Sequence, residues 1–312
     1  MPRFSCSTWI LIGVVLLILF AIGFLFPVPL PEVHLEAEPL PGLPTFITNT
    51  FLASLLTILV LLLIFLPVTL KPRLIPGRWQ AAVEWVLDWI LGLCEEVSGR
   101  KYGRLFFPIV ATIFLYIVVA ALLSLIPGFE VIGFGHPAPA EGIPGAFVGA
   151  YHGFVVDIPL LRKANTDINF PLALALASFI FVEIMGVRAL GFFRYAGRFI
   201  SLGEFLRGFG RLLKGRLRQG FSMLFFGLIE SFVGLIELIS EFIRVVSLTF
   251  RLFGNMTAGM ILLLLICYLV PWVVGSVFYG LEALFGFVQA LIFAGLTLAF
   301  AQIAVTPREI HG

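Results

Sequence analysis

Long stretches of this chain carry no charged side chain and are nearly long enough to cross a lipid bilayer. They include residues 9–26, 51–66, 106–126 and 170–182. A helix needs about 20 mostly apolar residues to span the hydrocarbon core, and each stretch reaches that length together with its flanks. Only 12% of the residues are charged, whereas soluble domains carry about 25%. These features predict an all-α integral membrane protein.

Basic residues predict how the helices are oriented, because cytoplasmic loops are enriched in Lys and Arg. They cluster between residues 71 and 104 and again between 188 and 218, whereas the segment 31–48 has three Glu and no basic residue. We therefore predict a multi-pass protein with a cytoplasmic C-terminus. Beyond the run at 9–26, the predicted helices lie at about 49–69, 105–126 and 168–187, followed by two long helices between about 221 and 306, which makes about six in all.

The N-terminal run is either a retained signal-anchor helix or a cleaved secretory signal. No A-x-A cleavage site follows it, so we favour a retained helix. The predicted organisation is an extra helix and outer segment over residues 1–40 and a main domain over 41–312. Two further segments, 79–97 and 199–219, are amphipathic, and we expect both to lie at the membrane surface. A solvated cytoplasmic helix is the alternative for each.

The most informative pattern is a polar stripe in the long apolar segment 221–270. About 50 residues at ~1.5 Å each would reach ~75 Å against a ~30 Å core, so this helix must tilt or bend. Polar residues recur every seven positions, which puts them on one helix face. They are Glu230, Glu237, Arg244 and Arg251, with Ser240 and Ser247 at the same spacing and Asn255 one turn after Arg251. The pattern predicts a polar groove.

Arg251 is the charge at the centre of this stripe. A charged side chain deep in a membrane helix is costly, and it marks an ion pathway or a partner. The guanidinium keeps its proton under ordinary conditions, so it can hold or repel charge but cannot relay its own proton. A buried pair with a nearby Glu is the structural alternative, although a single pair would not require a continuous stripe.

The last predicted helix carries Glu282 and Gln289, again seven residues apart. If the two long helices form an antiparallel hairpin that turns near Pro271, Gln289 reaches a depth similar to that of Arg251. Glu282 then lies nearer the outer surface.

The segment SLTFRLFGNMTAG, residues 247–259, resembles the signature of subunit a of F-type ATP synthases. Further short motifs resemble that family, and they occur along this chain in the same order as in the family. They are I-T-N within residues 41–50, I-P-G-F at 126–129, T-D-I-N at 166–169, G-V-R-A-L-G-F-F-R-Y at 186–195 and V-Q-A-L-I-F at 288–293. The resemblance covers residues 41–305 and leaves out the N-terminal run, most of the loop 130–163 and the basic insertion near 199–220.

This resemblance implies an all-helical clamp whose last two long, tilted helices, about 221–306, curve around a ring of c subunits. It implies a non-catalytic, ion-translocating stator subunit without a nucleotide site, a cofactor or a metal. The implied partners are the c ring, the b subunits of the peripheral stalk, membrane lipid and protons or Na⁺, with no nucleic acid. The implied location is the plasma (inner) membrane of a bacterial cell.

The resemblance also assigns roles to residues. Arg251 matches the arginine that separates two half-channels and acts on the carboxylates of the c ring. The implied proton path comprises Asn255 and Gln289 beside the arginine, Glu237, Ser240 and Ser247 toward the cytoplasm, and Asp167 and Asn169 at the outer mouth. Directly after the motif at residues 247–259, the family that the chain resembles usually has His or Glu, whereas this chain has Met260. We therefore expect Glu282 to be the sole titratable gate of the outer half-channel, without an ionisable neighbour.

Two other functions fit a charged membrane helix. A self-contained secondary transporter or ion channel with an intramembrane Arg site is the main alternative, and such proteins often show inverted repeats or broken helices. No repeat at a fixed spacing is visible in this sequence. A non-transporting assembly scaffold is the second alternative, and it would have no use for a charged stripe.

Overall fold

The computed structural model describes residues 37–42, 44, 47–70, 72–126, 129, 132–137, 154–192, 195, 217–269 and 273–306. The chain divides into two compact units. Unit 1 comprises residues 1–84, 113–170 and 252–292, and unit 2 comprises residues 85–112, 171–251 and 293–312. The predicted helix at 9–26 and most of the amphipathic segment 199–219 lie outside the described residues.

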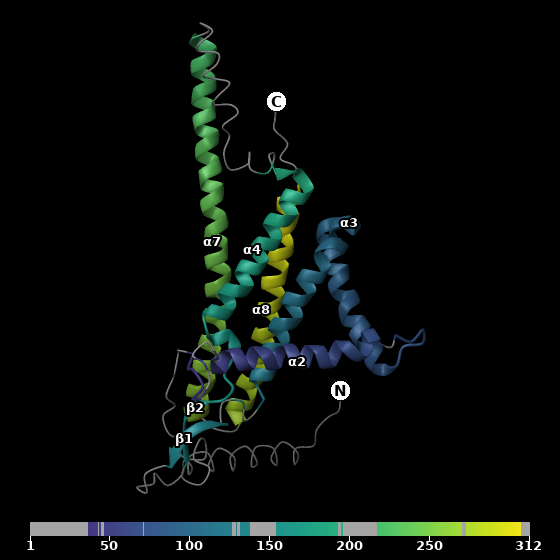
Figure 1. Cartoon of the computed structure of the whole chain (residues 1–312), viewed down its shortest axis with the longest axis vertical. Helices are drawn as coiled ribbons and strands as arrows, with labels where there is room; N and C mark the ends of the chain where they lie inside the picture. The colour runs from purple at the N-terminus through teal and green to yellow at the C-terminus, as the bar shows by residue number, and fades with distance from the viewer. Residues whose placement is uncertain are drawn as a thin grey trace, which may run out of the picture. The chain divides into compact units, whose positions relative to one another are not determined.

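Five helices in the described part of the chain are long and apolar enough to cross a membrane (Figure 1). They are α2 (Asn49–Leu70), α3 (Arg78–Ser124), α4 (Asn169–Leu190), α7 (Leu217–Leu269) and α8 (Val273–Val305). Their positions are close to those predicted from the apolar runs. The prediction of an all-α membrane protein is confirmed, and α7 is one continuous helix of 53 residues.

Helix α3 joins two segments that the sequence patterns separate, 79–97 and 105–126. Gly99 interrupts the helix with φ 69° and ψ 166°, a conformation that favours glycine. Figure 1 shows α3 as two arms joined at a bend. The arms pack backbone against backbone, because a Cβ on Gly103 would lie 2.6 Å from the carbonyl oxygen of Cys94. Arg104 Nε also donates to Glu95 Oε1 at 2.8 Å across this turn.

Unit 1 has a small apolar cluster at its centre. Ala53 of α2, Phe129 and Ala164 are buried there, with Leu56, Leu123, Leu161 and Phe170 packed around them. The Tyr116 hydroxyl of α3 donates to the carbonyl oxygen of Ser54 at 3.3 Å. Its ring stacks on Phe170 with the ring centres 5.0 Å apart. These contacts hold the start of α2 and the start of α4 to the second arm of α3.

Unit 1 also contains a small sheet that the sequence patterns did not predict. Strand β1 (Gly133–Pro137) pairs antiparallel with β2 (Phe154–Pro159), with an irregularity between Phe134 and Gly135. The short 3-10 helix η1 (Ala164–Thr166) follows β2 and leads into α4. The sheet therefore fixes the segment that carries Arg162 and Lys163, both of which are buried.

In unit 2, helix α4 packs against parts of α3 and α8. The rings of Phe106 and Phe181 meet edge to face at 5.9 Å. The hydroxyls of Ser178 and Thr297 share a buried hydrogen bond of 2.7 Å between α4 and α8. Such a bond satisfies two polar groups that would be costly to bury alone. It sets the relative height of the two helices in this unit.

Helices α7 and α8 run antiparallel in each unit. In unit 2, the Arg244 guanidinium lies over the Phe300 ring at 3.8 Å. In unit 1, Asn255 is hydrogen-bonded to Gln289. A Cβ on Gly259 would lie 3.7 Å from the Glu282 carboxyl carbon, so this glycine faces Glu282. Residue numbers rise along α7 as they fall along α8, as expected for the predicted hairpin.

Candidate functional site

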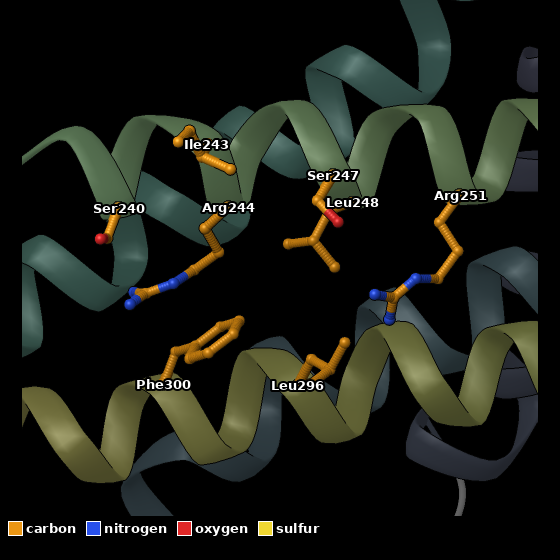
Figure 2. Close-up of a pocket in the computed structure, with 8 residues that line it drawn as sticks. All are labelled: Ser240, Ile243, Arg244, Ser247, Leu248, Arg251, Leu296 and Phe300. Atoms are coloured by element: carbon orange, nitrogen blue, oxygen red, sulfur yellow. The ribbon is translucent and has the colours of Figure 1, made fainter.

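A groove of about 280 Å³ runs along the polar stripe of α7 in unit 2. Its α7 wall carries four residues of the stripe and two apolar residues, and its α8 wall carries two apolar residues. The lining is Ser240, Ile243, Arg244, Ser247, Leu248, Arg251, Leu296 and Phe300 (Figure 2). The seven-residue spacing therefore produces the predicted polar groove over the span from Ser240 to Arg251.

Arg251 lies at one end of this groove, and its side chain reaches from α7 toward α8 (Figure 2). The side chain is exposed. Among the described residues it forms no salt bridge with a carboxylate. The structural alternative of a buried pair with a nearby Glu is therefore unsupported within the described part of the chain. A permanent positive charge at an open groove remains available to a charged group outside the chain.

Arg244 lies one heptad before Arg251 but has a different environment. Its guanidinium stacks over the face of Phe300, whose ring centre is 3.8 Å away. A guanidinium over an aromatic face gains about 0.5–2 kcal/mol, depending on how much water is excluded. The side chain is half-buried. Of the two stripe arginines in the groove, Arg244 is thus packed into the fold and Arg251 is open.

The other predicted residues of the stripe are only partly in the groove. Ser240 and Ser247 line it and are exposed. The Ser240 hydroxyl donates to the backbone carbonyl oxygen of Ile236 at 2.8 Å, which leaves its lone pairs free to accept. Glu237 is half-buried and does not line the groove. Glu230 lies on α7, but its side chain is outside the described part.

Asn255 and Gln289 form the polar link between α7 and α8 in unit 1. Asn255 Nδ2 donates to Gln289 Oε1 at 3.3 Å. Gln289 is only 3% exposed, and its Nε2 has no hydrogen-bond partner. Buried amides normally have partners, so this donor is available to water or an incoming group. The structure thus brings Asn255 of α7 against Gln289 of α8.

Glu282 is buried in α8, and its environment corrects one expectation. The Lys163 ammonium forms an ion pair with Glu282 Oε1, and both side chains are less than 10% exposed. The expectation that Glu282 has no ionisable neighbour is therefore wrong. The partner comes from a loop 119 residues earlier in the sequence, which no local pattern could connect to α8. Met260 is buried and apolar.

Asp167 and Asn169 lie at the start of α4. Asp167 Oδ1 accepts from the backbone N–H and from Nδ2 of Asn169, each at 3.1 Å. Its other oxygen accepts from the Thr50 hydroxyl of α2 at 3.0 Å. Both side chains remain at least partly exposed. Asp167 therefore stabilises the start of α4 and links it to α2, in addition to its predicted place at the outer mouth.

The predicted residues thus form two groups. Ser240, Ser247 and Arg251 line one groove in unit 2, whereas Asn255, Gln289, Glu282, Asp167 and Asn169 belong to unit 1. The sequence reasoning missed Lys163, Thr50 and Phe300 as contributors. A basic pair at 162–163 in a loop otherwise poor in charge was the one available signal for Lys163. Within the described ranges, no group of three or more His, Cys, Asp or Glu could hold a metal ion.

Comparison with known proteins decides the family. Residues 50–302 match the family described as ATP synthase A chain. This chain belongs to that family. It is 28% identical to ATP synthase subunit a of Helicobacter pylori over 266 residues, which are 85% of this chain and 92% of the relative. It is 29% identical to ATP synthase subunit a of Nitratiruptor sp. over 264 residues, 85% of this chain and 91% of the relative.

The match to the ATP synthase A chain family contains every residue of the predicted proton path. The family resemblance inferred from the arginine motif is confirmed. The chain is a multi-pass membrane protein of the F-type ATP synthase, in the subunit family that serves proton transport. The match gives no support to the alternative of a self-contained transporter. The division at residue 40 stays a prediction, although Leu40 is buried and pairs through its backbone N–H with Ile47.

Proposed function

We propose that this chain is the ion-translocating stator subunit of a rotary F-type ATP synthase, and that it provides two proton half-channels. In this proposal Arg251 acts on carboxylates carried by a ring of c subunits. The observation that supports it most is the environment of Arg251. It is a permanent cation that is exposed at a groove in a membrane helix and has no carboxylate partner among the described residues.

The chemistry of Arg251 follows from its fixed charge. A ring carboxylate within about 4–6 Å of a cation is favoured in its ionised form. A c subunit that approaches Arg251 would therefore release its proton, pass the arginine as an anion and take up a proton on the other side. The guanidinium does not give up its own proton, and it repels a hydronium ion. It thus opposes direct leakage of protons between the half-channels.

The polar residues of α7 suggest how the half-channels divide. Ser240 and Ser247 lie before Arg251 along the helix and line the groove. We assign them, with Glu237, to the cytoplasmic half-channel. Asn255, Gln289 and Glu282 lie in the other unit, and we assign them to the outer half-channel. Asp167 and Asn169, at the start of α4, would form its mouth.

An apolar surface on α7 fits a partner inside the membrane. Large apolar side chains that are more than half exposed lie before and beside the groove. They are Phe225, Leu228, Phe232, Leu235, Leu238, Phe242, Ile243 and Phe250. A ring of apolar c-subunit helices would cover such a face, and lipid would cover the rest. We also propose contact with the b subunits, a location in the plasma (inner) membrane of a bacterial cell, and a cytoplasmic C-terminus.

The test is Arg251→Ala in the intact complex, assayed in inverted membrane vesicles. We expect proton-driven ATP synthesis to fall to background while the complex still assembles and its soluble part still hydrolyses ATP. The matched control is Arg100→Ala, which removes an exposed arginine outside the predicted path. Near-normal synthesis in Arg251→Ala would refute the proposal.

A further inference from the structure

We propose that Lys163 is the second ionisable group of the outer half-channel, where it pairs with the Glu282 carboxylate and holds it in position to accept an entering proton. This inference rests on the proposed function. It assigns to a loop residue a positioning role in proton entry. The contact that carries it is the buried ion pair between Lys163 Nζ and Glu282 Oε1.

The first argument concerns the cost of burying the lysine. Lys side chains normally extend their ammonium toward water, yet Lys163 is only 6% exposed. Its backbone is held in place, because its carbonyl oxygen accepts from both the hydroxyl and the N–H of Thr166, at 2.8 and 3.2 Å. The neighbouring Ala164 belongs to the apolar cluster of unit 1. The fold therefore directs this cation to Glu282.

The second argument is that the ion pair is not well suited to stabilising the fold. A buried ion pair is often no more stabilising than two apolar residues of similar size. A pair that served the fold alone should also satisfy both carboxylate oxygens, since buried polar atoms normally have partners. Glu282 Oε2 is buried and has no hydrogen-bond partner. That oxygen is free to receive a proton from water.

The third argument is that the rest of this site is apolar. The small cavity beside Glu282 is otherwise lined by Gly259, Leu262, Leu263, Phe278, Leu281 and Phe285. Met260 on α7 is buried and cannot carry charge. A carboxylate without a partner is costly to bury in such surroundings. Lys163 supplies the opposite charge that offsets this cost.

The proton balance of this step is simple. Glu282 carboxylate accepts a proton from a hydronium ion to give the carboxylic acid and water, while Lys163 keeps its own proton. The acid then gives the proton, through water, to an ionised carboxylate of the c ring, and the ion pair between Glu282 and Lys163 forms again. Other charged groups on the same segment are Arg162, which is buried, and Asp167, which is bonded to Thr50.

The test uses the intact complex in vesicles and measures passive proton conduction after removal of the soluble part. We expect Lys163→Met to lower conduction by roughly tenfold or more. Lys163→Arg, which keeps the cation, should retain most of it. Lys101→Met, on an exposed lysine, is the matched control and should behave like the wild type. The double variant Lys163→Met with Glu282→Leu should conduct no worse than Glu282→Leu alone, since Lys163 acts through Glu282.

Several outcomes would overturn the inference. They are normal conduction in an assembled Lys163→Met complex, failure of Lys163→Arg to conduct, or a double variant markedly worse than Glu282→Leu. If Lys163→Met does not assemble, two variants still test the inference. They are Lys163→Arg and the double variant, in which two apolar residues replace the ion pair. Loss of synthesis in Arg251→Ala together with normal conduction in Lys163→Met would remove this inference and leave the proposed function intact. Normal synthesis in Arg251→Ala would remove the proposed function itself.

Discussion

Asn255 Nδ2 donates a hydrogen bond to Gln289 Oε1 at 3.3 Å, and this bond joins α7 to α8 one helical turn after Arg251. Gln289 is almost fully buried and keeps an unpaired Nε2. The two amides therefore offer both donors and acceptors one turn beyond Arg251 on α7, as the proposed proton path requires.

Loss of this amide pair should weaken proton flow. A hydrogen bond contributes about 0.5–1.5 kcal/mol, so Gln289→Leu or Asn255→Ala should lower proton-driven synthesis by up to roughly tenfold. The double variant should be little worse than either single variant, because both remove the same bond. Proton pumping measured with a pH-sensitive dye in vesicles gives the comparison. Losses that multiply in the double variant would show that the residues act separately.

Replacement of the central arginine by lysine tests geometry apart from charge. Lysine keeps one positive charge, but its ammonium is a compact, strongly hydrated point charge without the planar fork of a guanidinium. We expect Arg251→Lys to lose most proton-driven synthesis while the complex assembles, as judged by subunit content of the purified enzyme. Full activity in this variant would mean that charge alone is sufficient.

The outer half-channel should depend on Glu282 and not on Met260. Positioned proton-transfer groups typically contribute about a hundredfold or more, so Glu282→Gln and Glu282→Leu should reduce proton flux severely. Met260→Leu should change it little, because a volume-conserving apolar exchange costs less than about 1.5 kcal/mol. Flux and its dependence on outer pH are the measurements. Normal values for Glu282→Gln would make Asp167 the next candidate for the gate.

The close contact between the arms of α3 predicts a stability difference between two glycines. In Gly103→Ala the new Cβ would meet the Cys94 carbonyl oxygen at 2.6 Å, so the backbone must shift. We expect a loss of about 1–3 kcal/mol, as for other overpacked positions. Gly92 lies on the same helix with nothing within 4 Å of a new Cβ. Gly92→Ala should therefore be neutral or stabilising by up to about 1 kcal/mol.

Thermal unfolding of the purified chain in detergent compares these two variants. Equal midpoints would contradict the tight contact at Gly103. A loss in Gly92→Ala would instead indicate a partner on that face of the helix.

The helices and the arginine site could be predicted because their signals are local. Apolar runs fix which segments can be transmembrane helices, since backbone groups must bond within the segment in lipid. The seven-residue period then places Ser240, Ser247 and Arg251 on one face of α7, and the groove lies there. Such patterns need no knowledge of which distant segments meet. The sequence by itself therefore determined the membrane class, the stripe and, through residues 247–259, the family.

Contacts between distant segments were decided only by the tertiary structure. Lys163 and Glu282 are 119 residues apart and share no pattern, and their pairing depends on how the β1–β2 sheet and η1 hold one loop against α8. Similarly, Arg244 and Arg251 are equivalent in the stripe, but only Arg244 stacks on Phe300 of α8. Periodicity specifies the face of a helix on which a side chain lies. Which charge is buried, paired or left open depends on what the folded chain packs against that face.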